Sequence, residues 1–430
     1  MPSNVEEKVL KIFQKIFKIN KTVNNKASPE NINTWDSLGH LRLISELNKK
    51  LKIEISFEDT IKIRNLGDVI KTCIKYKKKK MKNIIQIGNK KVGIGYPTFT
   101  IAEIGSNHNR SKGTVKKLID ASALAGFDAV KFQIYDAEEA FSKKETTRDV
   151  KLEKLYGFKP WWKIARDKIL MPRSWFKEMF AYVRKKKMIP LSAIHRLEDL
   201  KFLKEFGLPA IKIASIDLNY FQLHEKIIKY KMPTIISTGM GLEKEIKDIV
   251  SFYKKNRNPN IVLLHCNSLY PPKEPQVNLR NISYLKKLTS IVGYSDHTID
   301  NYSAFAAVSL GANVIEKHIT LDKKFKGPDH PFAIEPDEMK DLIFGIRKIE
   351  KSLGNFKRIL SNQELKNRKM IRRSIVSKRK IIKGEIIQEK DIKYARPGTG
   401  IPTTEYKKVI NKIAKKNIES ETIIKVSMVK

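Results

Sequence analysis

The stretch SIVGYSDHTIDNYSAFAAVSLGANVIEKHIT (290–320) decides the fold class of this chain. Two short apolar runs, 290–297 and 314–320, flank a helix-length segment over 302–310. A strand, a helix and a second strand in this order form the βαβ unit of parallel sheets. Both runs end in polar side chains, and the carboxyl ends of parallel strands are where such folds place their binding groups. The stretch therefore predicts a parallel α/β architecture.

The same alternation continues upstream. Helix-length stretches such as 114–125 and 243–253 separate most of the earlier apolar runs. Eight strand–helix repeats over about 250 residues are typical of a TIM (β/α)8 barrel. A doubly wound open sheet alternates in the same way but rarely needs eight regular repeats, so we predict an α/β TIM barrel over residues 95–355. Its six earlier strands are expected at 98–105, 129–135, 187–194, 210–215, 233–239 and 260–267.

One interval interrupts this rhythm. Residues 136–186 are too many for one helix and two short loops, and the excess, 138–170, is aromatic and charged, with Phe158, Trp161 and Trp162. An insertion at this point emerges at the catalytic face of a barrel. It is either a lid or substrate loop or an insertion without a role in binding, and the sequence leaves both open.

Two smaller segments flank the barrel. Residues 1–77 show helical periodicity and are followed by a predicted basic linker, 78–94, that continues the lysine run of Lys75–Lys80. A second linker is expected over 356–371. The last segment, 372–430, has strand-like runs and many Gly and Pro residues, which predicts a small β-rich module.

Composition bounds the class of protein. The 430 residues are 41% hydrophobic, enough for two or three domains with real cores. The only two cysteines, Cys73 and Cys266, form no disulfide framework. No apolar run reaches the roughly 18 residues of a membrane-spanning helix, and the N-terminus lacks the pattern of a signal peptide. We expect a soluble cytoplasmic protein that does not act at a membrane.

The net charge of +40 suggests nucleic-acid binding as an alternative. Only 17 of the 86 basic residues are arginine, however, and arginine is the residue suited to bidentate phosphate and base contacts. The lysines are scattered along the whole chain. A compositional bias is therefore favoured over specific nucleic-acid binding, which salt-dependent retention on nucleic acid would support instead.

Polar side chains gather at the carboxyl ends of the predicted strands. A single charged residue in a strand is often a satisfied core group, but charges at most of eight strand ends are costly unless they are paired or bind a ligand. The ends therefore predict a site. Its candidate residues are Glu103, Asn107, Lys131, Gln133, Lys212, Ser215, Asp217, Ser237, Tyr270, Ser295, Asp296, His297, Glu316 and His318.

Two subsets suggest their own chemistry. Lys131 and Lys212, with nearby serine hydroxyls, would bind a small anion that carries phosphate and carboxylate groups. His297 and His318 lie on adjacent strands about 4.8 Å apart, so their imidazoles can converge on one divalent ion with open positions. Each histidine taken singly is more often a packed or hydrogen-bonded residue. The spacing alone therefore does not decide whether the pair binds a metal.

The motifs resemble the N-acetylneuraminate (sialic acid) synthase family. The resemblance spans about residues 95–350 in collinear order, and it implies condensation of phosphoenolpyruvate with an N-acetylmannosamine-type 2-acetamido sugar to a nonulosonic acid, with release of phosphate. The matching motifs are AEIGSNHN (102–109), KFQ (131–133), KIAS (212–215), ISTGM (236–240), LHCNSLYP (264–271), GYSDHT (293–298), EKHIT (316–320) and GPDH (327–330).

The resemblance also implies roles for single residues. A divalent metal, with manganese favoured, would be bound by His297 and His318, and Glu103 and Glu316 would orient the aldehyde and the attacking water. Phosphoenolpyruvate would be held by Lys131, Lys212, Ser215, Ser237 and Ser295, with Gln133 nearby. Tyr270, Asp329 and Arg396 would bind the sugar.

Some positions depart from the sialic acid synthase pattern. Ile216-Asp217 follows KIAS where those enzymes usually have Gly-Glu, so the expected substrate-binding carboxylate, Asp217, is one methylene shorter. Such features are closer to the pseudaminic and legionaminic acid synthases. They leave the identity of the sugar open.

The C-terminal segment, with RRSIV, IIKGE and ARPGTGI, resembles the antifreeze-like (SAF) domain of the same family. The resemblance implies a homodimer in which this domain caps the partner's barrel and brings Arg396 over its sugar site.

Residues 1–77 resemble an acyl or peptidyl carrier domain. TWDSLGHLRLI (34–44) matches the Asp-Ser-Leu motif of such domains, which implies a 4′-phosphopantetheine arm on Ser37, added by a phosphopantetheinyl transferase. The simpler interpretation is that Ser37 only caps a helix. Carrier domains are usually acidic, whereas this segment is basic.

Besides a synthase and a nucleic-acid-binding protein, a third class of function stays open. The chain could be a scaffold or carrier protein of a surface-glycan pathway whose barrel is inactive.

Overall fold

The computed structural model describes residues 2–19, 23–51, 53–81, 84–143, 150–157, 159–354 and 358–430. The chain divides into two compact units, Met1–Leu353 and Gly354–Lys430. No helix among the described residues is long and apolar enough to span a lipid bilayer.

Eight parallel strands form a closed barrel, in which β10 pairs with both β9 and β3. This confirms the predicted TIM-barrel fold and all eight predicted strands. Nearly every strand residue is buried, because the strands are covered by helices outside and by one another's side chains inside. The strands are β3 (Phe99–Glu103), β4 (Ala129–Ile134), β5 (Ile189–Ile194), β6 (Ile211–Ile213), β7 (Thr234–Ser237), β8 (Ile261–Cys266), β9 (Val292–Asp296) and β10 (Val314–His318).

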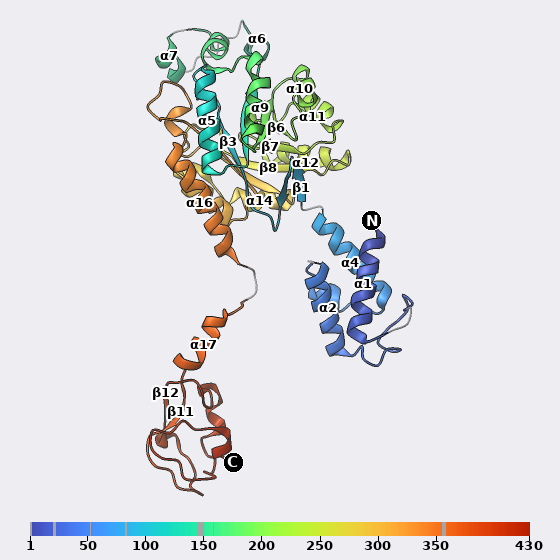
Figure 1. The fold of residues 1–430 in the computed structure, drawn as a ribbon, viewed down its shortest axis with the longest axis vertical. Helices are drawn as coiled ribbons and strands as arrows, with labels where there is room; N and C mark the ends of the chain where they lie inside the picture. Colours follow the sequence, from blue (N-terminus) through green and yellow to red (C-terminus); the bar gives the residue numbers. More distant parts are fainter. Residues whose placement is uncertain are drawn as a thin grey trace. The chain divides into compact units, whose positions relative to one another are not determined.

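Amphipathic helices surround these strands (Figure 1). In α5, for example, Val115, Leu118 and Ile119 face the strands, while the Ser111 hydroxyl accepts a hydrogen bond from the Thr114 amide at the N-terminus. The helices are α5 (Lys112–Ala125), α9 (Phe176–Lys185), α10 (Lys201–Glu205), α11 (Phe221–Ile228), α12 (Glu243–Lys255), α13 (Glu274–Val277), α14 (Asn281–Leu288), α15 (Tyr302–Ser309) and α16 (Pro336–Leu353). Short 3-10 turns cover Arg173–Trp175, Glu198–Leu200, Ser215–Asp217 and His330–Phe332.

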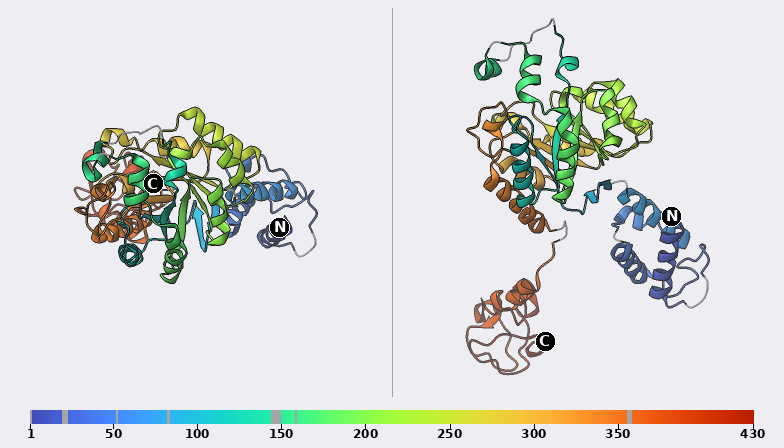
Figure 2. Two further views of the ribbon diagram at one scale, coloured as in Figure 1. Left: turned by 90° about the horizontal axis from the view of Figure 1, so that it is seen from above. Right: turned by 45° about the horizontal axis from the view of Figure 1, so that its top comes forward.

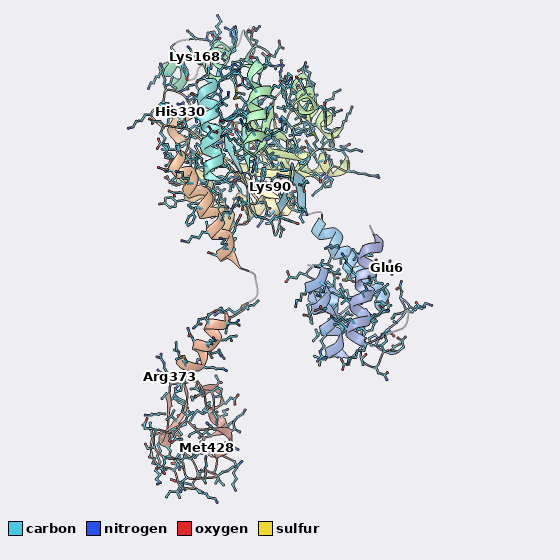
Figure 3. All side chains as sticks on the ribbon, viewed as in Figure 1. Glu6, Lys90, Lys168, His330, Arg373 and Met428 are labelled. Atoms are coloured by element: carbon cyan, nitrogen blue, oxygen red, sulfur yellow. The ribbon has the colours of Figure 1, made fainter. Side chains whose placement is uncertain are left out.

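A β-hairpin, β1 (Ile84–Ile87) and β2 (Lys90–Gly93), closes the amino-terminal end of the barrel. Ile85, Ile87 and Val92 pack against apolar side chains of the barrel interior such as Ile189 and Leu191. The Lys90 ammonium, labelled in Figure 3, lies 2.8 Å from the Asp128 carboxylate. The interpretation of 78–94 as a linker is therefore wrong for most of its length, because this alternating apolar segment has a core to cover.

The insertion after β4 lies at the opposite end of the barrel from the hairpin (Figures 1 and 2). It contains α6 (Ala137–Ala140), α7 (Val150–Tyr156), α8 (Trp161–Ile164) and a π-helical turn, Ala165–Ile169. Arg110, in the loop after β3, donates hydrogen bonds to the carbonyl oxygens of Arg166 (2.7 Å) and Leu170 (2.6 Å). These bonds fasten the insertion to the barrel. Phe158, singled out in the sequence, lies outside the described residues.

The helices α1 (Pro2–Phe17), α2 (Ser37–Leu51), α3 (Phe57–Thr60) and α4 (Leu66–Met81) form a bundle. Its core contains Phe13, Trp35 and Leu47, all fully or nearly fully buried. The helical character predicted from periodicity is confirmed, whereas α4 continues beyond the predicted end at residue 77.

The C-terminal unit begins with α17 (Asn362–Ile371), where a linker was expected over 356–371. The Ser361 side chain and Glu364 form a capping box that starts this helix. A small apolar core follows, centred on Ile375, Ile381 and Ile424. Regular strands are fewer than expected, because turns and isolated bridges take most of the chain. The remaining elements are β11 (Ser374–Ser377), β12 (Ile392–Ala395) and the 3-10 turns Glu389–Asp391, Thr403–Lys408 and Val426–Met428.

Candidate active site

Four buried charged side chains lie together at the carboxyl ends of the barrel strands. Glu103 ends β3 opposite Lys131 of β4, and Glu316 of β10 lies opposite Ser295 of β9. Lys212 comes from β6. None of the four charged residues is more than 4% exposed, so each must find its partner inside the protein.

These charges form one network. The Lys131 ammonium lies 2.8 Å from Glu103 Oε2 and 3.5 Å from Glu316 Oε1. The Gln133 amide donates to Glu103 Oε1 at 2.8 Å, and the Ser295 hydroxyl donates to Glu316 Oε1 at 3.0 Å. The sequence-predicted residues Glu103, Lys131, Gln133, Ser295 and Glu316 are thus brought into direct contact.

Lys212 differs from Lys131 in that its close partners are uncharged. Its ammonium donates to the Ser237 hydroxyl at 2.7 Å and to the Ile213 carbonyl at 3.0 Å, while the nearest carboxylate oxygen, of Glu316, is 4.0 Å away. Burial and the nearby Lys131 ammonium lower the pKa of Lys212, against the attraction of the Glu316 carboxylate. An incoming anion would supply the close counter-charge that Lys212 lacks.

Neighbouring charges also shift the pKa values of Glu316 and Lys131. Burial opposes the ionisation of Glu316, but the Lys131 and Lys212 ammoniums outweigh it and hold its pKa at about 2. Burial likewise opposes the charge of Lys131, yet the Glu103 and Glu316 carboxylates raise its pKa above the usual value. Lys131 and Glu316 are therefore charged at neutral pH.

A close backbone approach keeps the serines of this region together. The Ser215 hydroxyl accepts a hydrogen bond from the Gly239 amide at 3.0 Å. A side chain at position 239 would come within 2.7 Å of Ser215 Oγ and 2.5 Å of Ser268 Oγ, so both hydroxyls would have to move to admit one. The buried Ser268 hydroxyl has no hydrogen-bond partner among the described residues, which leaves a donor directed at this pocket of hydroxyls.

His297 and His318 come together beside this network, with ring centroids 5.4 Å apart. His297 Nδ1 is held 2.7 Å from the Asn267 carbonyl oxygen. His318 Nδ1 is buried without a hydrogen-bond partner among the described residues and lies 3.8 Å from Asp329 Oδ2. Burial lowers the pKa of His318, which favours the neutral imidazole that metals bind.

These donors fit a divalent ion with open coordination positions. A side chain at Gly105 would lie 2.9 Å from His318 Nδ1 and 2.5 Å from Asp329 Oδ2, so the glycine keeps the space between these two groups clear. Within the part of the chain that the structure describes, His, Cys, Asp and Glu side chains form no ready-made group of three ligands. A site of two imidazoles completed by substrate or water is consistent with both observations.

A cavity of about 1050 Å³ opens above these groups. Of the sequence-predicted residues, it is lined by Gln133, Tyr270, His318 and Asp329. The insertion contributes Phe141, Leu155, Trp161 and other side chains to the wall. This favours the substrate-loop interpretation of 138–170 over an insertion without a role.

Tyr270 covers the histidine pair. Its ring centroid lies 4.3 Å from that of His297 and 6.5 Å from that of His318. Its neutral phenol hydroxyl can donate a hydrogen bond at the cavity. Asp329 is positioned by Ser106, whose amide and hydroxyl each donate to its Oδ2 at 2.8 Å.

Five predicted residues are not part of this cluster. The Asn107 amide donates to the Ile319 carbonyl oxygen at 2.9 Å, and the Asp296 carboxylate lies 2.6 Å from the Lys317 ammonium. Asp217 lies in a 3-10 turn after β6, where its carboxylate contacts His195 at 2.7 Å. Arg396 follows β12 in the C-terminal unit, and Ser37 begins α2 of the helical bundle. His195 is absent from the sequence-based candidates although it directly follows the predicted strand 187–194, the position that identified the others.

The chain is similar to several known proteins. Residues 118–358 match the NeuB family, and residues 372–430 match the SAF domain. The chain is 38% identical to the N,N′-diacetyllegionaminic acid synthase of Campylobacter jejuni, over 76% of this chain and 99% of that protein. It is 35% identical to a pseudaminic acid synthase of the same species, over 80% of this chain and 99% of that protein.

A solved structure resembles the chain in the same way. The N-acetylneuraminic acid synthetase of Leptospira borgpetersenii, in complex with citrate, is 33% identical with a TM-score of 0.59. The match covers 66% of this chain and 94% of that one.

Proposed function

The chain belongs to the NeuB family and carries a C-terminal SAF domain, and we propose that it is a nonulosonic acid synthase. In this reaction, phosphoenolpyruvate condenses with a 2-acetamido sugar of the N-acetylmannosamine type, and phosphate is released. The observation that carries the proposal is the buried Lys131–Glu103–Glu316–Lys212 network beside two convergent histidines at one end of the barrel. Phosphoenolpyruvate is a cytoplasmic metabolite, so we expect the reaction to take place there.

The network suits a small, highly charged anion. Lys212, which lacks a close carboxylate, would pair with the phosphate or carboxylate of phosphoenolpyruvate, and Lys131 would add a second positive charge. The hydroxyls of Ser215, Ser237 and Ser295 would complete the hydrogen bonds. Because Lys131, Lys212, Ser237 and Ser295 are buried, their interactions with the anion are little screened by solvent.

Carbon–carbon bond formation then needs an activated aldehyde and a positioned water. A divalent metal held by His297 and His318, for which we favour Mn²⁺, would act as a Lewis acid that polarises the sugar aldehyde. Glu103 and Glu316 would orient the aldehyde and the water. C3 of phosphoenolpyruvate attacks the aldehyde carbon, the water adds at C2, and phosphate leaves from the resulting tetrahedral carbon.

The sugar would occupy the large cavity. Tyr270 and Asp329 line it beside His318, and the insertion supplies aromatic walls. Apolar and aromatic walls suit acetamido methyl groups, which fits a 2-acetamido sugar and leaves further acetamido groups as candidates.

Phosphate release from phosphoenolpyruvate with a panel of aldoses tests the proposal. The panel contains N-acetylmannosamine, its phosphorylated form, diacetamido-trideoxyhexoses and mannose as the control without an acetamido group. We expect phosphate release with one acetamido sugar, together with a product whose mass equals sugar plus pyruvate. If phosphoenolpyruvate releases no phosphate with any of these sugars in the presence of Mn²⁺, the barrel is not a synthase. That result would support a scaffold protein with an inactive barrel.

We further propose a homodimer in which the SAF domain places Arg396 over the partner's sugar site. The separate compact unit 354–430 and its SAF match support this arrangement. Mixing two variants, Lys131→Met and Arg396→Ala, each impaired alone at subsaturating phosphoenolpyruvate, tests it. If the subunits exchange and share sites, the mixture recovers part of the activity, because one site of each hybrid dimer has both residues. A mixture as inactive as its components would contradict the shared site.

For the helical bundle, we propose a carrier function with 4′-phosphopantetheine on Ser37. Ser37 is exposed at the start of α2, and the Asp36 carboxylate caps the helix by accepting from the Gly39 amide at 2.6 Å. The helix is thus capped by its neighbour, and the Ser37 hydroxyl is left accessible for modification. The exposed side chains of Leu38 and Leu41 beside it offer an apolar surface on which a transferase can dock.

A further inference from the structure

A buried histidine that the proposed mechanism does not use lies in the wall of the cavity. His195 follows β5, and its side chain is 5% exposed. Its Nδ1 lies 2.7 Å from Asp217 Oδ2, whereas its Nε2 is buried and has no hydrogen-bond partner among the described residues. One nitrogen is therefore fixed and the other is unsatisfied.

His195 stands between two cavities. Together with Tyr135 and Ile216 it lines both the 1050 Å³ cavity and a neighbouring one of about 520 Å³. Its ring and that of Tyr135 pack nearly perpendicular to each other, with ring centroids 4.6 Å apart. These contacts fix the plane of the imidazole at the junction of the two spaces.

The hydrogen bond to Asp217 sets the chemistry of the second nitrogen. A carboxylate accepts from Nδ1–H, so in the neutral imidazole Nε2 is an acceptor. A buried polar atom without a partner is unfavourable, so the site is better satisfied when a ligand bonds to it. An acceptor of this kind at a cavity wall is suited to a ligand that donates a hydroxyl or an amide N–H.

We propose that His195 is a substrate-binding residue that accepts a hydrogen bond from a hydroxyl or amide N–H of the sugar, and that Asp217 positions its ring. This inference rests on the proposed synthase function and assigns Asp217 a supporting role in place of direct sugar contact. Ile216 and Tyr135 would form the apolar faces on either side of that polar contact.

Two substitutions separate binding from structural support. In His195→Asn the amide lies where Nδ1 was, so the contact with Asp217 is kept and the group at Nε2 is lost. In His195→Gln the longer side chain places an amide near the former Nε2. We expect KM for the sugar to rise about tenfold in the Asn variant, the loss of one hydrogen bond, and no more than about threefold in the Gln variant. KM for phosphoenolpyruvate should change in neither, and thermal unfolding of both variants checks that they are folded.

Other patterns in the kinetics overturn the inference. If His195→Asn has the wild-type KM for the sugar and His195→Gln does not, His195 acts only by holding Asp217. Equal effects in both variants, or a change in KM for phosphoenolpyruvate, also contradict a specific sugar contact. If the wild type turns over no sugar, the synthase proposal fails by itself, and titration calorimetry of the same sugars decides for His195. Sugar binding that is weaker in His195→Asn and kept in His195→Gln supports the contact. If the wild type binds none of these sugars, the inference is overturned.

Discussion

The Lys131 ammonium lies 2.8 Å from the Glu103 carboxylate, and both side chains are buried inside the barrel. The register of β3 and β4 places the two residues directly opposite each other. Taking two charges out of water is expensive, and replacing such a pair by apolar residues is often neutral or stabilising. A buried pair that also reaches Glu316 is therefore better explained by the binding of a charged substrate than by stability.

Removing either lysine of the network should weaken phosphoenolpyruvate binding. We expect Lys131→Met and Lys212→Met each to raise KM for phosphoenolpyruvate at least tenfold, because a charge-assisted hydrogen bond contributes about 1.5–3 kcal/mol. Lys131→Met should also lower stability by about 3–5 kcal/mol, since Glu103 loses its partner. Steady-state kinetics and thermal unfolding measure the two effects. Lys116→Met, at an exposed ion pair with Glu178, is the control and should change neither. An unchanged KM in both variants would place the anion site elsewhere.

Glu316 should make the barrel sensitive to acid. Its pKa falls from the ordinary 4.5 to about 2 on folding, so its ionisation stabilises the folded state above about pH 4.5, and this contribution is lost as the pH falls through 2. The difference in Tm between wild type and Glu316→Gln should therefore be largest above pH 4.5 and shrink toward pH 2. Glu205→Gln, at an exposed helix position, is the control and should give only a small difference in Tm. A pH-independent difference for Glu316→Gln contradicts this prediction.

Metal binding should depend on the histidine pair. We expect a chelator to abolish turnover and added Mn²⁺ to restore it. His318→Ala and His297→Ala should each weaken Mn²⁺ binding, measured by calorimetry, by more than about 100-fold, since even outer contacts of metal ligands contribute 10–100-fold. His40→Ala, in the helical bundle, should bind Mn²⁺ like wild type. Full activity after complete metal removal would refute the assignment.

The β1–β2 hairpin should contribute to the stability of the barrel. Ile87 is fully buried among the interior side chains, whereas the neighbouring Gln86 is exposed. We expect Ile87→Ala to lower the free energy of unfolding by about 2–5 kcal/mol, the usual effect of such a deletion in a core. Gln86→Ala should change it by less than about 0.5 kcal/mol. Denaturant unfolding distinguishes them, and equal values would mean that the hairpin does not cover the barrel end.

Ser37 should carry a covalent arm. After co-expression with a phosphopantetheinyl transferase, we expect intact-mass spectrometry to show the added mass of 4′-phosphopantetheine on the wild type and not on Ser37→Ala. Turnover of free sugar should be the same in both, because all proposed barrel residues lie after residue 95. An unmodified wild type, or the same added mass on Ser37→Ala, would leave the bundle without a carrier function.

The sequence alone determined the barrel and most of its polar centre. Strand and helix periodicities are local, so eight apolar runs separated by amphipathic stretches were enough to predict the order β3 to β10. The carboxyl ends of parallel strands meet at one face of a barrel, and this rule predicts that Glu103, Lys131 and Glu316 lie close together, as they do.

Only the tertiary structure decided which of these side chains are paired and what covers the barrel. The run 84–93 is short and basic, and its role in the core depends on barrel residues about a hundred positions away, such as Ile189. Asp217 faces His195 rather than the charge network because the 3-10 turn after β6 redirects it. Contacts of this kind join residues far apart in sequence, and side-chain direction at a turn is set by packing, which no periodic pattern encodes.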